Sequence, residues 1–220
     1  MIEIVTIEVC GFKTALHGMR NPKNSWERSD TDMDVPGTVS GVTIGEKDMD
    51  LALKLAQGGP VHAKYRRMIH VSADITAPLY WWKEADTYRI GVEKNSCSTM
   101  HTLHKRDLTI WDFSHEHLTT RSMQNLEGTI VLINEYRREY LKKLEQGDPE
   151  AKEDWWQMIQ LLPSSFNQMR TMEFSYEALA NICRWRRDHK QDEWREFVKW
   201  AEGLPYSELF IGKENENENA

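Results

Sequence analysis

The groups with most chemistry to offer are guanidinium and aromatic side chains in the last third of the chain. The run Arg-Trp-Arg-Arg-Asp-His-Lys at 184–190 carries four cations and one anion, so its charge is +3 with His neutral. The spacing predicts a helix over 176–187 that buries Ala178, Ile182 and Trp185 and leaves the arginines at the margin. Guanidinium groups there could bind a phosphate in a bidentate manner. The alternative is a solvated last helical turn, where the helix dipole favours cations.

A second polar segment, residues 101–117, carries four histidines among acidic residues. His115 and His117 are two residues apart and diverge on a helix, and no known zinc spacing is matched. Cys97 lies between two serines and precedes His101, but nothing orients the imidazole and no nucleophile elbow is present. Both segments are therefore predicted to be polar loops. The sequence assigns no metal site and no catalytic residue, and it contains no glycine-rich phosphate loop.

Composition sets the class of protein. The 220 residues are 40% hydrophobic and 29% charged, which is ordinary for one globular domain that has a sizeable core. No apolar run reaches the ~18 residues of a spanning helix, and the first residues do not resemble a secretory signal, so we expect no membrane partner. Three dispersed cysteines favour a reducing, cytoplasmic setting. A net charge of −7 argues against general nucleic-acid binding.

Hydrophobic periodicity predicts a helix-rich α+β fold, with a small mixed or antiparallel sheet, in a single domain over residues 1–210. The polar residues 211–220 are predicted to form a disordered tail. Residues 18–45 are rich in glycine and proline and are predicted to be a long loop, a kind of segment that tends to be functional or disordered. Residues 91–112 are predicted to be irregular. Strands are expected at 2–9, 68–77 and 169–174, and helices at 46–57, 79–90, 114–145, 150–162, 176–187 and 192–202.

Two stretches resemble the flavin-dependent thymidylate synthase family, also known as thymidylate synthase complementing proteins. Residues 77–90 are similar to the strand of that family that ends in Ala-Pro, the helix after it and the Arg-His-Arg triplet that closes the helix. Residues 162–188 are similar to the stretch from Leu-Pro to a helix ending in Leu-Arg-x-Asp, including an Asn five residues before the Arg. The order of elements over 46–202 also fits.

The resemblance implies a homotetramer in which FAD takes a hydride from NAD(P)H. The flavin then reduces a methylene group that methylenetetrahydrofolate delivers to deoxyuridylate, a pyrimidine nucleotide, and no protein nucleophile attacks the base. The residues that match flavin-binding positions are Tyr88, Arg89, Ile90 and Asn181. The residues assigned to the nucleotide are Asn95, Ser98, Arg170 and Arg186, of which Asn95, Ser98 and Arg170 match only after a shift of one residue.

This chain also departs from the signature of that family. Only the last arginine of the triplet, Arg89, is in place. Each lost charge-assisted contact to a phosphate costs about 1.5–3 kcal/mol. Two alternatives therefore stay open: a phage-type enzyme that modifies another uridine nucleotide, and a non-catalytic, oligomeric nucleotide- or flavin-binding protein on the same scaffold. The substituted positions are Val92 for Ser, Lys94 for Asn, Cys97 for Ser, Thr99 for Arg and Met169 for Arg.

Overall fold

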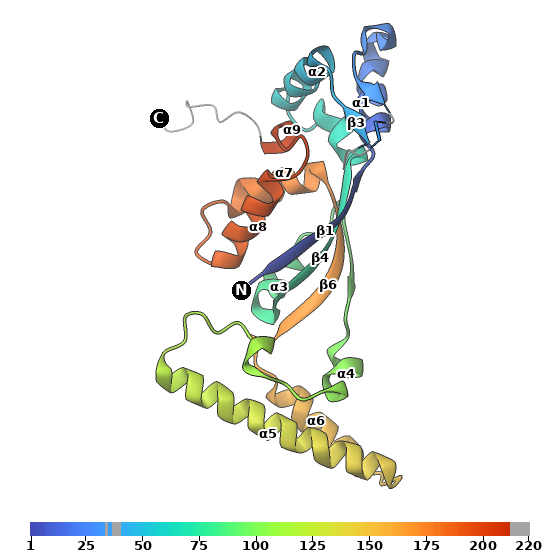
Figure 1. Ribbon diagram of the computed structural model, residues 1–220. Helices are drawn as coiled ribbons and strands as arrows, with labels where there is room; N and C mark the ends of the chain where they lie inside the picture. The colour runs from blue at the N-terminus through green and yellow to red at the C-terminus, as the bar shows by residue number, and fades with distance from the viewer. Residues whose placement is uncertain (34, 37–40, 212–220) are drawn as a thin grey trace. The chain divides into compact units, whose positions relative to one another are not determined.

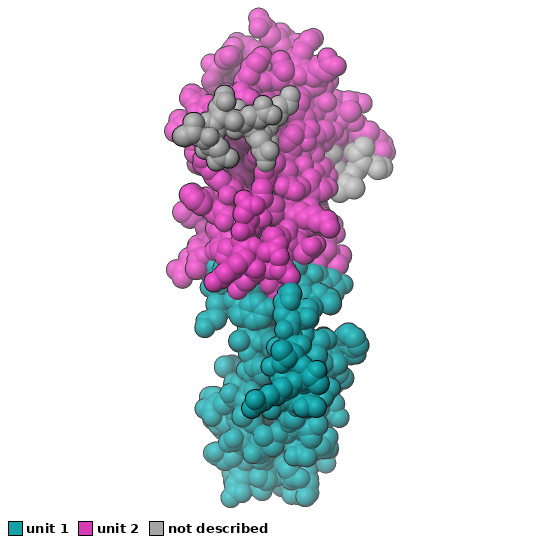
Figure 2. Space-filling view, turned by 90° about the vertical axis from the view of Figure 1, so that its left-hand side faces the viewer, with its two compact units in different colours: residues 1–3, 76–86, 95–170 teal, residues 4–75, 87–94, 171–220 magenta. Residues whose placement is uncertain are grey.

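The computed structural model describes residues 1–33, 35–36 and 41–211 (Figure 1). The chain forms two compact units, coloured separately in Figure 2. Unit 1 contains residues 1–3, 76–86 and 95–170, and unit 2 contains residues 4–75, 87–94 and 171–220. That residues 1–210 act as one domain stays a prediction. In the predicted tail, Ile211 is the last residue of a short helix, and residues 212–220 lie outside the described residues.

The main sheet has four strands in the order β1-β4-β6-β5. Along β4 and its ends, Ile69 and Leu79 form backbone hydrogen bonds with Tyr176 and Phe166 respectively, so β6 runs antiparallel to β4. A second sheet is a two-residue antiparallel pair in which residues 32–33 face 42–43. The helix-rich fold with a small antiparallel sheet is confirmed. The strands are β1 (Glu3–Cys10), β2 (Asp32–Met33), β3 (Val42–Thr43), β4 (His70–Pro78), β5 (Val92–Ser96) and β6 (Asn167–Ser175).

Nine α-helices lie within the described residues, together with short 3-10 turns. Two predicted helices, α2 and α8, coincide with the expected ranges 46–57 and 192–202. Among the described residues, no helix combines the length and the apolar character that crossing a membrane requires. The helices are α1 (Phe12–Arg20), α2 (Glu46–Gln57), α3 (Leu79–Ala85), α4 (Thr99–Thr102), α5 (Thr120–Glu145), α6 (Ala151–Leu161), α7 (Tyr176–Arg186), α8 (Asp192–Glu202) and α9 (Glu208–Ile211).

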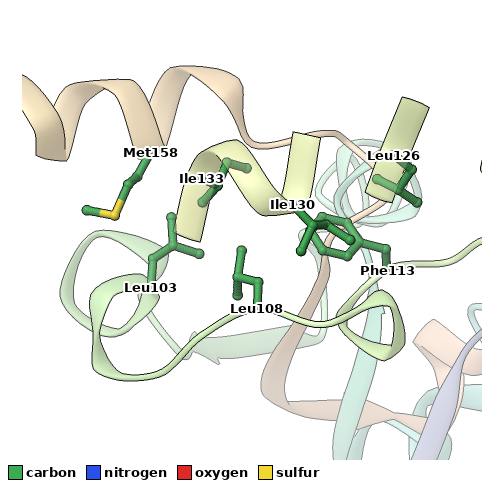
Figure 3. Packing of buried hydrophobic residues seen from close by; sticks show 7 residues of the cluster. All are labelled: Leu103, Leu108, Phe113, Leu126, Ile130, Ile133 and Met158. Carbon is green, nitrogen blue, oxygen red and sulfur yellow. The ribbon is translucent and has the colours of Figure 1, made fainter. Parts of the chain in front are cut away.

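The core of unit 1 lies between α5, α6 and the segment before α5. Helices α5 and α6 lie side by side (Figure 1), and side chains from the 103–113 segment pack against them (Figure 3). Thr119 caps α5 because its hydroxyl accepts the N–H of Ser122. The 103–113 segment is held against α5 and α6 by its apolar residues, although most of its side chains are polar. The buried cluster is Leu103, Leu108, Phe113, Leu126, Ile130, Ile133 and Met158.

Unit 2 is built on edge-to-face aromatic contacts. The ring of Tyr176, at the start of α7, contacts those of Phe12 and Phe210 at centroid distances of 5.7 and 4.7 Å. Its hydroxyl donates to the carbonyl of Pro205 at 2.6 Å, so the one polar atom of this buried ring is satisfied. Phe174 and Phe197 form a neighbouring pair at 5.5 Å. Rings from α1, α7 and α9 thus form one cluster, and rings from β6 and α8 form the neighbouring pair.

Several local predictions were wrong for identifiable reasons. Residues 18–45 include the end of α1, two 3-10 turns and the β2–β3 pair, so they are not one long loop. Residues 91–112 include β5, which the periodicity missed because only Val92 of that strand is buried. The helix expected over 79–90 ends at Ala85, and α5 begins at Thr120 rather than near 114. On α7 the buried face continues through Cys183, whereas Trp185 is 69% exposed.

A buried ion pair joins α1 to α2 in unit 2. Arg20 Nε donates to Asp48 Oδ1 at 2.6 Å, and these side chains are 4% and 0% exposed. The other carboxylate oxygen accepts hydrogen bonds from Ser29 and from the backbone and side chain of Thr31. Burial alone would raise the pKa of Asp48, but these hydrogen bonds and the charge of Arg20 lower it. The carboxylate therefore stays ionised and fully partnered.

We predict that Asp48→Asn lowers the free energy of unfolding by about 3–5 kcal/mol, because it leaves the Arg20 guanidinium buried without its counter-charge. Urea unfolding at pH 7 measures the loss. Since the pKa of Asp48 is lower in the folded than in the unfolded chain, its contribution is complete above about pH 4 and is lost as the pH falls through the folded value.

The matched control is Asp50→Asn on the same helix. Asp50 forms an exposed pair with Lys54 at 3.2 Å, and losing such a pair costs only about 0.3–0.5 kcal/mol. Equal losses of stability in the two variants would contradict the role assigned to Asp48.

Candidate functional site

An arginine between two aromatic rings forms the first candidate feature, in unit 2. The guanidinium of Arg186, on α7, lies 5.5 Å from the ring centroid of Tyr88 and 4.6 Å from that of Trp194. Arg186 Nε donates to the Tyr88 hydroxyl at 2.8 Å. The rings of Tyr88 and Trp194 meet edge to face at 5.8 Å. We call these three residues the arginine–aromatic cluster.

The turn that carries Tyr88 depends on Gly91. The φ angle of Gly91 is +69°, and a Cβ there would lie 2.6 Å from the hydroxyl oxygen of Ser175. Ser175 caps α7 by accepting the N–H of Ala178, and its own N–H donates to the Gly91 carbonyl at 2.9 Å. Only glycine combines this conformation with so close an approach. The residues that precede β5 are thus fixed against the first turn of α7.

The other residues predicted on the flavin side are exposed in unit 2. Arg89 and Ile90 follow Tyr88 in the turn, and Ile90 is 94% exposed. Arg89 forms no ion pair or hydrogen bond with the described part of the chain. Asn181 lies on α7, five residues before Arg186, with its side chain exposed. A free cation, an exposed apolar side chain and an amide are therefore available on this unit.

The second candidate feature is a cavity of about 620 Å³ in unit 1. Cys97, Thr99 and Met169 line it, and these are positions at which the resemblance implies nucleotide-binding Ser, Arg and Arg. Cys97 N–H donates to the carbonyl of Met169 at 2.9 Å just beyond β5, so the two chain segments are held together. Trp111 and Phe166 also contribute to the walls. We call this space the unit 1 cavity.

Charged groups of both signs line the unit 1 cavity. Arg106 and Lys105 line it together with Asp112 and Glu3. Arg106 forms a two-pronged ion pair with Asp112, in which Nη1 donates to Oδ2 at 2.8 Å. Burial would raise the pKa of Asp112, but hydrogen bonds from Arg106 and the Thr109 N–H lower it, so this pair is ionised. Lys105 has no ion-pair partner in the parts of the chain that the structure describes.

Arg170 contacts Gln168, a residue that lines the unit 1 cavity. Its guanidinium donates to Asp86 at 2.9 Å and to the side-chain oxygen of Gln168 at 3.0 Å, and it lies 4.3 Å from the ring centroid of Trp82. The Gln168 amide in turn donates to the Cys97 carbonyl at 2.8 Å. Arg170 therefore orients a residue that lines the cavity, whereas it does not line the cavity itself. Its predicted role in binding the substrate stays a prediction.

The structure brings together some of the predicted site residues. Tyr88 and Arg186 are in contact, whereas Arg170 lies in unit 1 with Asn95 and Ser98. Asn95 is exposed on β5, and Ser98 precedes α4, where its carbonyl accepts the hydroxyl of Thr102. The roles of these predicted residues in binding flavin or nucleotide stay predictions.

Sequence reasoning missed Lys105 and Arg106. Both belong to the 101–117 segment that was expected to be a polar loop. The available signal was an adjacent pair of cations close to Trp111. In the same segment, His115 Nδ1 hydrogen-bonds the Phe113 carbonyl at 2.7 Å, and His104 contacts Tyr140 edge to face. No group of metal-binding side chains occurs among residues 1–33, 35–36 and 41–211.

No family model and no curated protein matches the sequence. Solved structures do match. A structure of thymidylate synthase X from Helicobacter pylori with FAD and dUMP is 16% identical, with a TM-score of 0.63 over 96% of this chain and 97% of that one. This chain has the fold of the flavin-dependent thymidylate synthases. A second structure of the flavin-dependent enzyme from Helicobacter pylori, complexed with FAD and dUMP, gives a TM-score of 0.62 at 16% identity, over 95% and 97% of the chains.

We predict that Tyr88→Phe lowers the free energy of unfolding by about 1.5 kcal/mol, because Arg186 Nε loses its acceptor while the aromatic face is kept. Thermal and urea unfolding measure the change. Tyr136→Phe is the control, since Tyr136 is half-buried beside the unit 1 core and its hydroxyl forms no hydrogen bond with the described residues. A Tyr88→Phe variant as stable as this control would show that the hydrogen bond contributes nothing.

Proposed function

We propose that this protein is a divergent flavin-dependent thymidylate synthase that binds FAD and a uridine nucleotide and methylates the base reductively. The observation that carries the proposal is the likeness of fold, which extends over nearly the whole length of both chains. The solved relatives hold FAD and dUMP. When bound, FAD would supply hydride transfer, with NAD(P)H and methylenetetrahydrofolate as the co-substrates that the resemblance implies.

The unit 2 residues fit the flavin. A flavin nucleotide offers a flat apolar ring and an anionic pyrophosphate. Ile90 and the half-buried ring of Tyr88 provide apolar and aromatic surface for the ring, and the unpaired Arg89 guanidinium suits the pyrophosphate. Asn181 adds a donor and an acceptor. Arg186 is already held between two rings, so its orientation is fixed before any ligand binds.

The unit 1 cavity offers a uridine nucleotide fewer cations than a site with arginines at positions 99 and 169 would offer. The backbone wall is formed by Cys97 and Met169, with the ring of Trp111 nearby for a base. Lys105 is the cation on this wall that can reach a phosphate without first breaking an ion pair among the described residues. We therefore expect weaker nucleotide binding here than in a site with a full set of guanidinium groups.

Absorption titration with FAD tests the flavin site. We predict that the purified protein binds FAD with a perturbed flavin spectrum, and that Arg89→Ala weakens binding roughly tenfold to a hundredfold, the loss of one charge-assisted contact. Arg121→Ala is the control, because Arg121 is an exposed arginine of α5. A chain that takes up no FAD would remove the proposal.

Calorimetry with dUMP tests the nucleotide site. We predict that Lys105→Gln weakens dUMP binding roughly tenfold, because the phosphate loses a charge-assisted contact. Lys152→Gln, an exposed lysine of α6, should leave the affinity unchanged. If both variants bind dUMP like the parent protein, the nucleotide phosphate does not contact Lys105.

Turnover assays distinguish the two alternatives, an enzyme that modifies another uridine nucleotide and a non-catalytic binding protein. Assays that compare dUMP with other uridylates, in the presence of NADPH and methylenetetrahydrofolate, identify a change of substrate. Binding of FAD and nucleotide without product in any of these assays favours the non-catalytic binding protein. That alternative is supported by the Thr99 and Met169 side chains, which are neutral where the resemblance implies cations.

A further inference from the structure

A basic pocket of about 510 Å³ lies in unit 2, outside the residues assigned to flavin or nucleotide. It is formed by the 3-10 turns that follow α1 and by the first half of α2. Four cations line it, and Glu27 is the one carboxylate among its lining residues. The cations of the basic pocket are Arg20, Lys23, Arg28 and Lys47.

Two of these cations are free to meet a ligand. Lys23 and Lys47 are exposed, and neither ammonium group has an ion-pair partner in the described ranges. Arg28 is only 3.8 Å from Glu27, and both side chains are largely exposed, so this contact is weak. The Asp30 carboxylate is occupied by the backbone N–H groups of Lys47 and Asp48 at the start of α2. Asp30 itself lies before β2 and not on α2, and it is not one of the residues that line the pocket.

Arg20 contributes an unsatisfied donor to this wall. Its Nε is bound to Asp48, and its Nη1 donates to the Ser25 carbonyl at 3.3 Å. Its Nη2 is buried and has no hydrogen-bond partner among the described residues. Buried guanidinium nitrogens are nearly always paired, so this nitrogen is a candidate donor to a ligand.

The remaining walls favour a polar ligand over an apolar one. Asn24 and Ser25 line the pocket, and Leu51 is its one apolar lining residue. Asn24 adopts a left-handed conformation with φ of 46°, which asparagine tolerates better than most residues. Such conformations outside glycine recur at ligand sites.

We propose that the basic pocket binds the di- or triphosphate group of a small molecule, separately from the FAD and nucleotide sites. The cations come from two elements, the segment 20–28 and the start of α2, and a chain of phosphates has more anionic oxygens to offer them than a single phosphate has. The side-chain N–H groups of Asn24 and the hydroxyl of Ser25 can donate to phosphate oxygens.

The test uses the full chain and inorganic pyrophosphate and tripolyphosphate as probes. Lysine acetylation with mass spectrometry reports each residue separately, at matched ionic strength. We expect protection of Lys23 and Lys47 at least fivefold greater than that of Lys54, which lies on α2 outside the pocket. Protection of all three lysines to the same degree would overturn the proposal.

Calorimetry with the same probes gives a second readout. Lys23→Gln with Lys47→Gln is expected to weaken tripolyphosphate binding at least tenfold, while the charge-matched Lys54→Gln with Lys64→Gln leaves it unchanged. Lys105→Gln should not alter the protection of Lys23 and Lys47, so this outcome is independent of the unit 1 cavity. Unchanged affinity in the Lys23–Lys47 variant would overturn the site.

Two further ligands identify the source of the phosphates. ATP that binds more tightly than tripolyphosphate indicates a nucleoside triphosphate, and equal binding indicates that the phosphate chain alone is recognised. A single-stranded oligonucleotide that protects Lys23 and Lys47, when the polyphosphates do not, would replace the small-molecule site by a nucleic-acid contact.

Discussion

The pairing of β5 with β6 connects the two stretches of sequence on which the functional interpretation depends. At one end, the Ser175 N–H reaches the Gly91 carbonyl, and at the other the Cys97 N–H reaches the Met169 carbonyl, both at 2.9 Å. Because side chains alternate along a strand, a slip of one residue would exchange the two faces of each segment. The residues before β5 would then lose their place against α7. Register along this one ladder therefore decides whether the arginine–aromatic cluster and the unit 1 cavity exist.

The cations of the candidate sites differ in whether they already have a partner within the protein. Arg186 is held by Tyr88 and Trp194, Arg170 by Asp86 and Gln168, and Arg106 by Asp112. Arginines held in this way have lost side-chain entropy on folding rather than on binding, and they orient their neighbours. Arg89 and Lys105 have no such internal partner among the described residues. Those two residues can gain a full charge-assisted contact from a ligand.

The sequence allowed most of the fold to be predicted, because long elements carry their own periodicity. Helices α2 and α8 show this, since a glycine follows the last residue of each, and Ser175 caps α7 as its residue type predicts. Prediction failed where tertiary contacts override local pattern. Trp185 continues an apolar spacing yet faces solvent, because the buried face of α7 turns toward Cys183. The two stretches of resemblance assigned Tyr88 and Arg186 to the site. The contact between these two residues, and the cavity that Lys105 lines, depend on tertiary packing that one-dimensional patterns do not reveal.

The residues that line the unit 1 cavity also indicate which changes would strengthen phosphate binding. Thr99 and Met169 both already reach this hollow, from a helix and from a strand whose backbone is fixed by the ladder. Arginine at these two positions would place two guanidinium groups on the cavity wall. The charge of the cavity wall therefore depends on two side chains, whereas the fold depends on the strand pairing and the core. Substitutions at two positions would be enough to change that charge.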